Sequence, residues 1–244
     1  MKTYGLIGYP LDHSFSGKYF GEKFEKENIQ NCEYRLFPLE NIQGFVNLEK
    51  QKIAGLNVTI PYKEQIIPYL DELDSHAKAI GAVNVIQFIN GKTKGYNSDY
   101  YGFKDSLSHF LPKDFKSKAL ILGTGGASKA IKQVLTDLSI PFKIVSRKVA
   151  FDFTYEELNA KPEIIQDFQL IINTTPLGTY PKVEEKPDLP YEALTENHYF
   201  YDLVYNPSET AFMKAGATNG AKTINGLEML VGQAEKSWEI WNKN

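Results

Sequence analysis

Short runs of β-branched and other apolar residues alternate along almost the whole chain with stretches whose apolar positions recur every three or four residues. The first pattern predicts strands and the second predicts amphipathic helices. Strands are predicted at 4–8, 33–38, 56–60, 83–89, 119–122, 142–146, 170–173 and 199–203. Helices are predicted at 16–28, 64–73, 100–111, 128–138, 208–219 and 226–244. This alternation predicts an α/β fold of βαβ units, with largely parallel sheets and helices on both faces.

The length and one linker predict two domains. At about 150 residues per domain, 244 residues make one or two domains. A lysine-rich link at 113–118 separates a helix pattern that ends at Leu111 from a fresh strand pattern. We therefore expect a domain boundary in this region, and we expect the final helix to return to the first domain. The predicted domains are 1–101 plus 226–244, and 102–225.

Charge and cysteine content narrow the class of protein. Lys and Arg total 27 against 30 Asp and Glu, a net charge of −3, which argues against a chain that coats nucleic acid. One cysteine, Cys32, excludes an internal disulfide framework and any zinc module built on cysteine pairs. The apolar stretch at the N-terminus is too short for a secretory signal, and no run is long enough for a membrane span. We therefore expect a cytoplasmic protein.

A glycine-rich turn follows the strand pattern 119–122 and opens a helix pattern. Gly123 suits the tight turn, Gly125 allows close approach of backbone to a pyrophosphate, and the helix N-terminus supplies amides. Ser128 occupies the third position of this dinucleotide-binding pattern, with Gly126 and Ala127 before it. The turn therefore predicts a Rossmann-type nucleotide site.

The next strand pattern distinguishes between two cofactors. An NAD site needs a carboxylate near its end, whereas this pattern runs into Ser146-Arg147-Lys148 and reaches no carboxylate before Asp152. A hydroxyl and two cations suit a 2′-phosphate, because guanidinium groups pair with phosphate oxygens. NADP is therefore favoured over NAD, with a solvated basic loop as the alternative.

Polar side chains cluster in the first hundred residues, mostly at the predicted carboxyl ends of strands. They are Ser14, Ser16, Asn57, Thr59, Lys63, Asn84 and Asp99. Ser14 and Asp99 could each be a helix cap, Lys63 could be a surface lysine and Asn84 a turn residue. Pro61 suits the first turn of a helix that would carry Lys63. Because ligands bind at this edge of open parallel sheets, the cluster as a whole suits a small polyhydroxylated acid.

Eight motifs in order give the chain a resemblance to the shikimate dehydrogenase family. They are His13-Ser14-Phe15-Ser16, Asn57 to Lys63, Gly81 to Asn84, Asn97 to Gly102, Gly123 to Ser128, Asn173 to Gly178, Asp202 to Pro207, and Asn225 to Gln233. The resemblance implies a substrate-binding domain and an NADP-binding Rossmann domain, with substrate in the cleft between them. It implies reversible reduction of 3-dehydroshikimate to shikimate, a step of aromatic amino-acid biosynthesis.

The resemblance also implies roles for particular residues. Lys63 and Asp99 would form the catalytic pair. Substrate would be held by Ser14, Ser16, Thr59, Asn84, Asp99, Tyr205 and Gln233. The cofactor would be held by Gly123, Gly125, Gly126, Ala127, Ser128, Ser146, Arg147, Lys148, Thr174, Gly226 and Met229. Where the family often has proline and a His-Asn pair after the second serine, this chain has Gly17-Lys18-Tyr19-Phe20. Where the family's basic motif often carries a further cation, Phe151 stands.

Three functions remain as hypotheses. The first is an NADP-dependent shikimate dehydrogenase in which the Lys63 ammonium hydrogen-bonds the substrate oxygen and Asp99 orients that amine. The second is a relative that acts on quinate or another cyclic polyol, and the third is a non-catalytic NADP-binding sensor. No metal is expected, because the four histidines form no i, i+4 pair, and no Gly-x-Ser-x-Gly elbow favours a serine hydrolase. We expect a monomer or a homodimer that binds a small molecule.

Overall fold

A computed structural model describes residues 1–12, 14–48 and 52–243 of the chain. The chain divides into two compact units. Unit 1 comprises residues 1–101 and 233–244, and unit 2 comprises residues 102–232. Both boundaries fall inside helices, since α3 spans Ser98–Phe110 and α7 spans Leu227–Asn242. The predicted return to the first domain at residue 226 precedes the second boundary, which lies in the second turn of α7.

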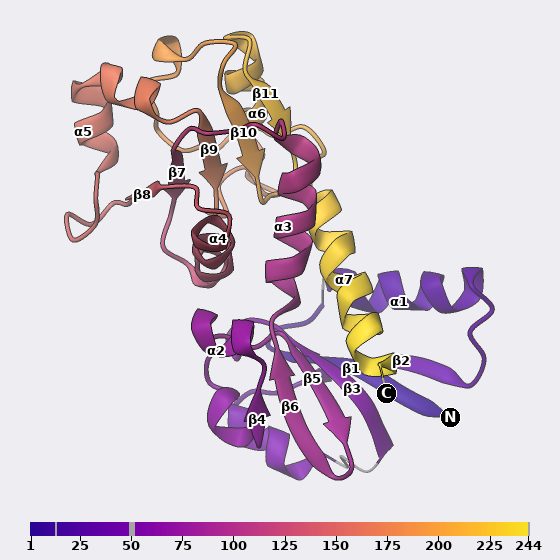
Figure 1. The fold of residues 1–244 in the computed structure, drawn as a ribbon. Coiled ribbons are helices and arrows are strands. Elements are labelled where there is room, and N and C mark those ends of the chain that lie inside the picture. Colours follow the sequence, from indigo (N-terminus) through magenta and orange to yellow (C-terminus); the bar gives the residue numbers. More distant parts are fainter. Residues whose placement is uncertain (13, 49–51, 244) are drawn as a thin grey trace. The chain divides into compact units, whose positions relative to one another are not determined.

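The described strands of unit 1 form one sheet in the order β2-β1-β3-β5-β6-β4 (Figure 1). Their bounds are β1 Lys2–Gly8, β2 Cys32–Pro38, β3 Ile53–Val58, β4 Glu72–Leu73, β5 Val85–Ile89 and β6 Lys92–Tyr96. Strands β1, β2 and β3 are parallel, whereas β5 runs antiparallel to β3 and to β6. The sheet is therefore mixed, where the sequence predicts largely parallel pairing.

Opposite faces of this sheet bury different clusters. On one face, Tyr4 and Val85 pack with α1 (Phe15–Lys26) and with the last turns of α7, including Trp241. On the other, Ile7, Leu56 and Ile86 pack with η1 (Ile42–Asn47) and η3 (Ile67–Tyr69). The neighbours Val85 and Ile86 point to opposite faces because side chains alternate along a strand.

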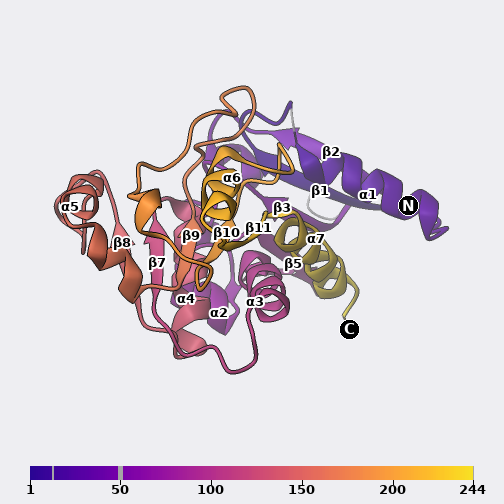
Figure 2. The ribbon, with the colours of Figure 1, turned by 90° about the horizontal axis from the view of Figure 1, so that it is seen from above.

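Unit 2 contains a parallel sheet in the order β11-β10-β9-β7-β8 across the residues described. The strands are β7 Ala119–Leu122, β8 Phe142–Val145, β9 Leu170–Asn173, β10 Tyr199–Asp202 and β11 Lys222–Ile224. Phe200 stacks on Phe212 of α6 (Ala211–Thr218), and its neighbour Tyr201 packs on Phe103 of α3. Helices thus cover both faces, and Figure 2 shows α6 and α4 (Gly126–Asp137) on opposite sides of β9 and β10. This is the predicted Rossmann-like α/β arrangement.

Most predicted elements are confirmed within two or three residues, and one helix is wrong. The segment predicted as a helix at 64–73 consists of turns, η3 and the short strand β4. Pro68 explains the difference, since proline lacks the N–H that a helix interior requires. The structure adds β4, β6, β11, η1, α2 (Ser75–Ile80), α5 (Tyr155–Ala160), η4 (Pro162–Asp167) and η5 (Tyr191–Ala193).

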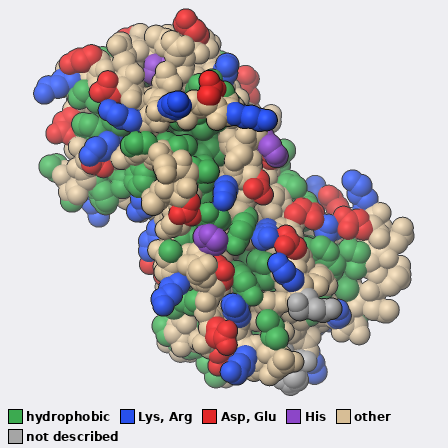
Figure 3. Space-filling model, in the orientation of Figure 1, with side chains coloured by type: hydrophobic (Ala, Val, Ile, Leu, Met, Phe, Trp, Pro, Cys, Tyr) green, Lys and Arg blue, Asp and Glu red, His purple; other side chains and the backbone are tan. Residues whose placement is uncertain are grey.

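Charged residues of both signs are mixed at the surface. On the face drawn in Figure 3, Lys and Arg side chains alternate with Asp and Glu, and neither sign forms a continuous patch. Among the described residues, every helix is too short or too polar to span a lipid bilayer.

A buried carboxylate lies at the end of β10. Asp202 is fully buried and accepts hydrogen bonds from Asn173 Nδ2 at 2.9 Å, Val204 N at 3.0 Å and Thr210 Oγ1 at 2.6 Å. Burial raises the pKa of the Asp202 carboxyl from 3.8 to about 6, against the opposing effect of these three donors. The network ties the ends of β9 and β10 to the start of α6.

The Asp202 pKa predicts a pH dependence of stability. Between about pH 4 and pH 6 the folded chain holds a proton on Asp202 that the unfolded chain releases, so the free energy of unfolding falls as pH rises through this window. Asp202→Asn mimics the protonated carboxyl at every pH. Relative to the unmodified protein, we expect the free energy of unfolding of this variant to rise by about 2–3 kcal/mol between pH 4 and pH 7. Urea unfolding followed by far-ultraviolet circular dichroism measures the change.

Asp152→Asn is the matched control. Despite partial burial, hydrogen bonds from the Lys143 ammonium and the Ile144 N–H lower the pKa of the Asp152 carboxyl. Its stability contribution is present above the ordinary carboxyl pKa and is lost only as pH falls below it, so between pH 4 and pH 7 the difference in stability between the control and the unmodified protein should stay nearly constant. An Asp202→Asn effect of equal size at pH 4 and pH 7 would contradict the prediction.

Candidate active site

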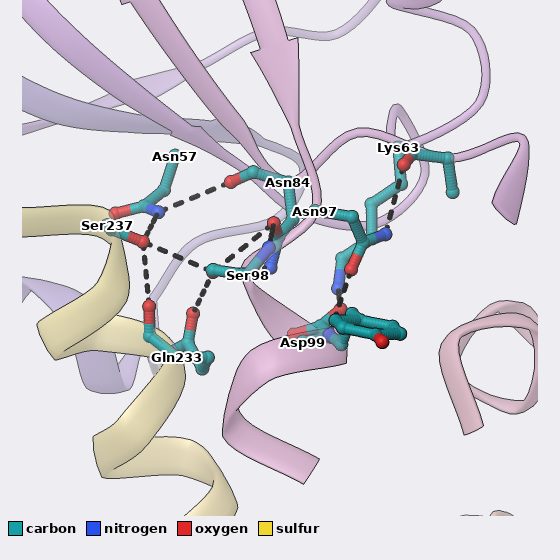
Figure 4. A network of polar contacts seen from close by, with 10 residues as sticks. Asn57, Lys63, Asn84, Asn97, Ser98, Asp99, Gln233 and Ser237 are labelled. Carbon is teal, nitrogen blue, oxygen red and sulfur yellow. Dashed lines mark hydrogen bonds and ion pairs between the residues drawn. The ribbon is translucent and has the colours of Figure 1, made fainter. Parts of the chain in front are cut away.

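A lysine and a carboxylate meet in unit 1. Lys63 Nζ donates to Asp99 Oδ2 at 2.5 Å, and both side chains are mostly buried, with exposed fractions of 25% and 14% (Figure 4). Charge-assisted hydrogen bonds of this kind are short and strong. The ammonium keeps two further N–H groups, so the pair can donate to an oxygen of a bound molecule.

Backbone contacts hold Lys63 in place. The Tyr62 N–H donates to the Thr59 carbonyl, and the Val83 N–H donates to the Lys63 carbonyl at 2.7 Å. The segment after β3 therefore turns back against the residues that precede β5. The prediction that Pro61 begins a helix carrying Lys63 is wrong, because residues 63–66 form turns and η3 begins at Ile67.

Asp99 lies in the first turn of α3 and does not cap it. Asn97 does so instead, since its Oδ1 accepts from the Tyr100 N–H at 3.3 Å while its Nδ2 donates to the Ala82 carbonyl. The Asp99 carboxylate is thereby left to pair with Lys63. The cap interpretation of Asp99 is wrong for this reason.

Asn84 and Gln233 belong to one buried network in unit 1 (Figure 4). The Ser98 N–H donates to Asn84 Oδ1 at 2.6 Å, and Asn84 Nδ2 donates to Ser98 Oγ at 3.1 Å. Ser98 Oγ in turn lies 3.4 Å from Gln233 Oε1. Gln233 comes from α7, so the last helix brings one predicted substrate residue into the network that holds another, Asn84.

The other predicted residues of unit 1 flank α1 and β3. Ser14 occupies the N-cap position of α1 but makes no side-chain cap hydrogen bond, and Ser16 lies in the first turn of the same helix. Asn57 accepts from the Tyr34 hydroxyl at 2.8 Å and donates to Ser237 Oγ at 2.9 Å. Thr59 is fixed by its backbone, whose N–H donates to the Ile7 carbonyl at 2.9 Å. His13, which opens the first motif, lies outside the described residues.

The glycine-rich turn of unit 2 has the backbone shape that the sequence predicts. Gly123 has φ +102°, a conformation that L side chains rarely adopt, and an added Cβ would lie 2.9 Å from Thr175 Cγ2. Gly125 is the N-cap residue of α4, which therefore begins with no capping side chain. The first N–H groups of α4 are thus available to an anion, as a pyrophosphate site requires.

The remaining residues of the turn lie within the helix start. Gly126 and Ala127 form the first positions of α4. Ser128 is fully buried, and its hydroxyl donates to the Gly125 carbonyl at 2.7 Å. Ser128 therefore stabilises the conformation of the turn through its buried hydroxyl.

A basic loop follows β8. Arg147 and Lys148 are exposed, and the Lys148 N–H donates to Ser146 Oγ at 3.1 Å. Asp152, the first carboxylate after the strand, pairs with Lys143 and the Ile144 N–H. Asp152, the carboxylate that could bind a ribose hydroxyl, therefore pairs with groups of β8 instead. The side chains of Arg147 and Lys148 are exposed in the loop.

Four further predicted residues also lie in unit 2. Thr174 Oγ1 donates to the Leu122 carbonyl at 2.7 Å, which ties the end of β9 to the end of β7. Gly226 approaches the Leu203 backbone so closely that an added Cβ would lie 2.2 Å from its carbonyl oxygen. Tyr205 is 37% exposed, and Met229 is buried in the first turn of α7.

Sequence reasoning missed two members of the unit 1 network, Tyr34 and Ser237. Ser237 could have been found, because it lies four residues after Gln233 and so shares its helix face. Tyr34 carries no such signal, since it is one of several apolar residues along a strand. In the described part of the chain, no group of three His, Cys, Asp or Glu side chains is arranged to hold a metal ion.

Comparison with known proteins gives consistent matches. A family model described as the shikimate dehydrogenase substrate binding domain matches residues 6–86. The chain is 41% identical over 257 residues to a shikimate dehydrogenase (NADP(+)) of Clostridium beijerinckii, covering 100% of this chain and 93% of the relative.

Two solved structures extend the similarity to the fold. A chorismate mutase/shikimate 5-dehydrogenase fusion protein from Clostridium acetobutylicum is 39% identical with a TM-score of 0.88, covering 99% of this chain and 91% of that one. A shikimate 5-dehydrogenase from Thermus thermophilus, solved with NADP(H) and shikimate, is 27% identical with a TM-score of 0.86, covering 100% of this chain and 94% of that one.

The glycine turn predicts a separation of binding from stability. An added Cβ at Gly125 meets no atom within 4 Å, and the residue has φ −72°. We expect Gly125→Ala to change the free energy of unfolding by less than about 1 kcal/mol. The methyl group would stand where a pyrophosphate must approach, so the dissociation constant for a dinucleotide should rise at least about tenfold.

Gly21→Ala in α1 is the control, because an added Cβ there also meets nothing within 4 Å. It should leave dinucleotide binding unchanged and slightly stabilise the helix. Isothermal titration calorimetry measures the binding. Equal dissociation constants for Gly125→Ala and the unmodified protein would contradict the assignment of this turn.

Proposed function

The chain belongs to the shikimate dehydrogenase family, and on that premise we propose that it interconverts 3-dehydroshikimate and shikimate with NADP(H), an oxidoreductase step of aromatic amino-acid biosynthesis. The observation that carries the proposal is the 2.5 Å contact between Lys63 and Asp99. A non-catalytic sensor would have no need of a mostly buried ammonium held by a carboxylate.

Unit 2 supplies a fitting place for the dinucleotide. The uncapped start of α4 offers N–H groups to the pyrophosphate, and Gly123 holds the turn that presents them. Arg147 and Lys148 would pair with the 2′-phosphate that distinguishes NADP from NAD. Ser146, Thr174, Gly226 and Met229 complete the proposed contacts.

Unit 1 would bind the substrate. Hydroxyl and amide groups of Ser14, Ser16, Thr59, Asn84 and Gln233 would hold its carboxylate and ring hydroxyls. The bound molecule is small. We propose a cytoplasmic monomer or homodimer, in keeping with the single cysteine and the biosynthetic role.

The chemistry assigned to this chain concerns the oxygen of the ketone. NADPH, when bound, supplies the hydride to carbon. The Lys63 ammonium donates a hydrogen bond to the ketone oxygen, which stabilises the negative charge that develops there and provides the proton. Asp99 accepts from the same ammonium, which fixes the direction of the Lys63 side chain. Asp99 can also accept from a neighbouring substrate hydroxyl through its second oxygen.

One assay separates the proposal from its alternatives. Purified protein is mixed with NADP⁺ or NAD⁺ and with shikimate or quinate, and the absorbance of reduced nicotinamide is followed. We expect the highest kcat/KM with shikimate and NADP⁺. A preference for quinate would support the polyol alternative, and no turnover with any of the four pairs would support a sensor.

Replacing Lys63 tests the catalytic pair. Lys63→Ala should lower kcat by about 10²–10⁴-fold, the usual contribution of a positioned acid–base group. The KM for shikimate should change less than about threefold, because the proposed binding contacts lie elsewhere. Lys18→Ala is the control, since it removes an exposed lysine paired with Glu22 and should leave both constants unchanged. A kcat for Lys63→Ala within threefold of the unmodified protein would refute the assignment.

A further inference from the structure

A continuous chain of hydrogen bonds runs beneath the proposed substrate residues of unit 1. It begins at Tyr34 of β2, passes through Asn57 of β3, and reaches Ser237 of α7. Tyr34 and Ser237 have no assigned role in substrate binding. Tyr34 lies on β2 and contacts Asn57, and Ser237 lies one turn after Gln233 on α7.

The donors along this chain have a defined direction. Asn57 Nδ2 donates to the Asn84 carbonyl at 3.2 Å and to Ser237 Oγ at 2.9 Å, so Asn57 Oδ1 must face Tyr34. The Tyr34 hydroxyl therefore donates to Asn57 Oδ1 at 2.8 Å.

The same chain continues to two proposed substrate residues. Ser237 Oγ donates to the Gln233 carbonyl at 2.8 Å, one turn earlier in α7, and lies 3.2 Å from Ser98 Oγ. Ser98 in turn holds both ends of the Asn84 amide and lies 3.4 Å from Gln233 Oε1. Figure 4 shows Asn57, Ser237, Ser98, Asn84 and Gln233 directed toward one another.

Burial makes each link costly to lose. Ser98 and Ser237 are fully buried, and Asn57 and Asn84 are 4% and 3% exposed. Among the described residues that are not exposed, no fully buried side-chain nitrogen or oxygen lacks a hydrogen-bond partner. Removing one hydroxyl leaves its partner unsatisfied, and that partner must move or rotate to recover a bond.

We propose that Tyr34 and Ser237 are positioning residues for the substrate, which fix the side chains of Asn84 and Gln233 through Asn57 and Ser98. This inference rests on the proposed function, because it assigns the substrate contacts to those two side chains. Preorganised contacts of this kind lower the ordering that substrate binding must otherwise impose. Neither residue touches the Lys63–Asp99 pair, so the chemical step does not depend on them.

The Tyr34 hydroxyl can be removed without disturbing the packing of its ring. The ring stacks on Phe20 at 4.7 Å and lies 6.5 Å from the Trp241 ring, and phenylalanine keeps both contacts. Tyr96→Phe is a matched control. The Tyr96 hydroxyl donates to Gln87 Oε1 at 3.0 Å in the same unit, and its removal leaves in place the bonds from Gln87 Nε2 to the Ile240 and Lys243 carbonyls that anchor α7.

The test compares steady-state constants for shikimate oxidation. Tyr34→Phe and Ser237→Ala should each raise the KM for shikimate about tenfold while kcat changes less than threefold. The KM for NADP⁺ should stay unchanged in both. Tyr96→Phe should leave the KM for shikimate unchanged, even if its melting temperature falls as far as that of Tyr34→Phe.

The double variant provides a readout that a purely structural role would not give. Tyr34 and Ser237 both act through Asn57, so the rise in KM for the double variant should be smaller than the product of the two single rises. Multiplicative effects would overturn the shared pathway.

The outcomes also separate this inference from the proposed function. An unmodified protein that does not oxidise shikimate refutes the function, and the inference fails with it. An active protein in which Tyr34→Phe leaves the KM unchanged, or lowers only kcat, overturns the inference and leaves the function standing.

Discussion

The last turns of α7 lie against the sheet of unit 1, where the Trp241 indole N–H donates to the Ile86 carbonyl and the Ile240 carbonyl accepts from Gln87 Nε2. Lys23 of α1 adds an ion pair to Glu235 at 2.8 Å, with the lysine side chain only 6% exposed. Gln233 and Ser237 lie on the same helix as these anchors. The docking of α7 therefore determines where the amide of Gln233 and the hydroxyl of Ser237 lie relative to Asn57, Asn84 and Ser98.

The catalytic pair depends on a different and more local constraint. Lys63 follows β3 and Asp99 follows β6. The Val83 N–H donates to the Lys63 carbonyl and the Tyr100 N–H donates to Asn97 Oδ1, which fixes the segments that carry the pair. Their contact thus does not require α7. In unit 1 the reactive pair is therefore held by the turn after β3 and by the start of α3. The binding network is held by the last helix. This separation is the physical reason to expect distinct effects on kcat and KM.

Much of the fold followed from periodicity, and the exceptions have identifiable causes. The β5–β6 hairpin was missed because Lys92–Tyr96 shows little apolar alternation, although Asn90-Gly91 is a strong turn signal. Helix α2 was missed because it has only six residues, although Asp74 and Gly81 mark its two ends. The prediction of a helix at 64–73 is wrong because apolar spacing alone does not include the free-energy cost of Pro68 in a helix interior. Short elements and mixed strand direction are the features that periodicity conveys least well.

The order of most α and β elements, the glycine turn with its basic loop, and a cluster of polar residues that includes Lys63 and Asp99 could be predicted from the amino-acid sequence alone. These are local properties, since a turn, a helix start or a charged side chain is specified by neighbours in the chain. Three features became visible only in the folded chain. Asn97 caps α3, the Ser128 hydroxyl donates to the Gly125 carbonyl, and Tyr34 and Ser237 belong to one network. Hydrogen bonds form over about 3 Å and depend on direction, so they select among many polar residues only after packing has placed residues as far apart as Asn57 and Ser237 side by side.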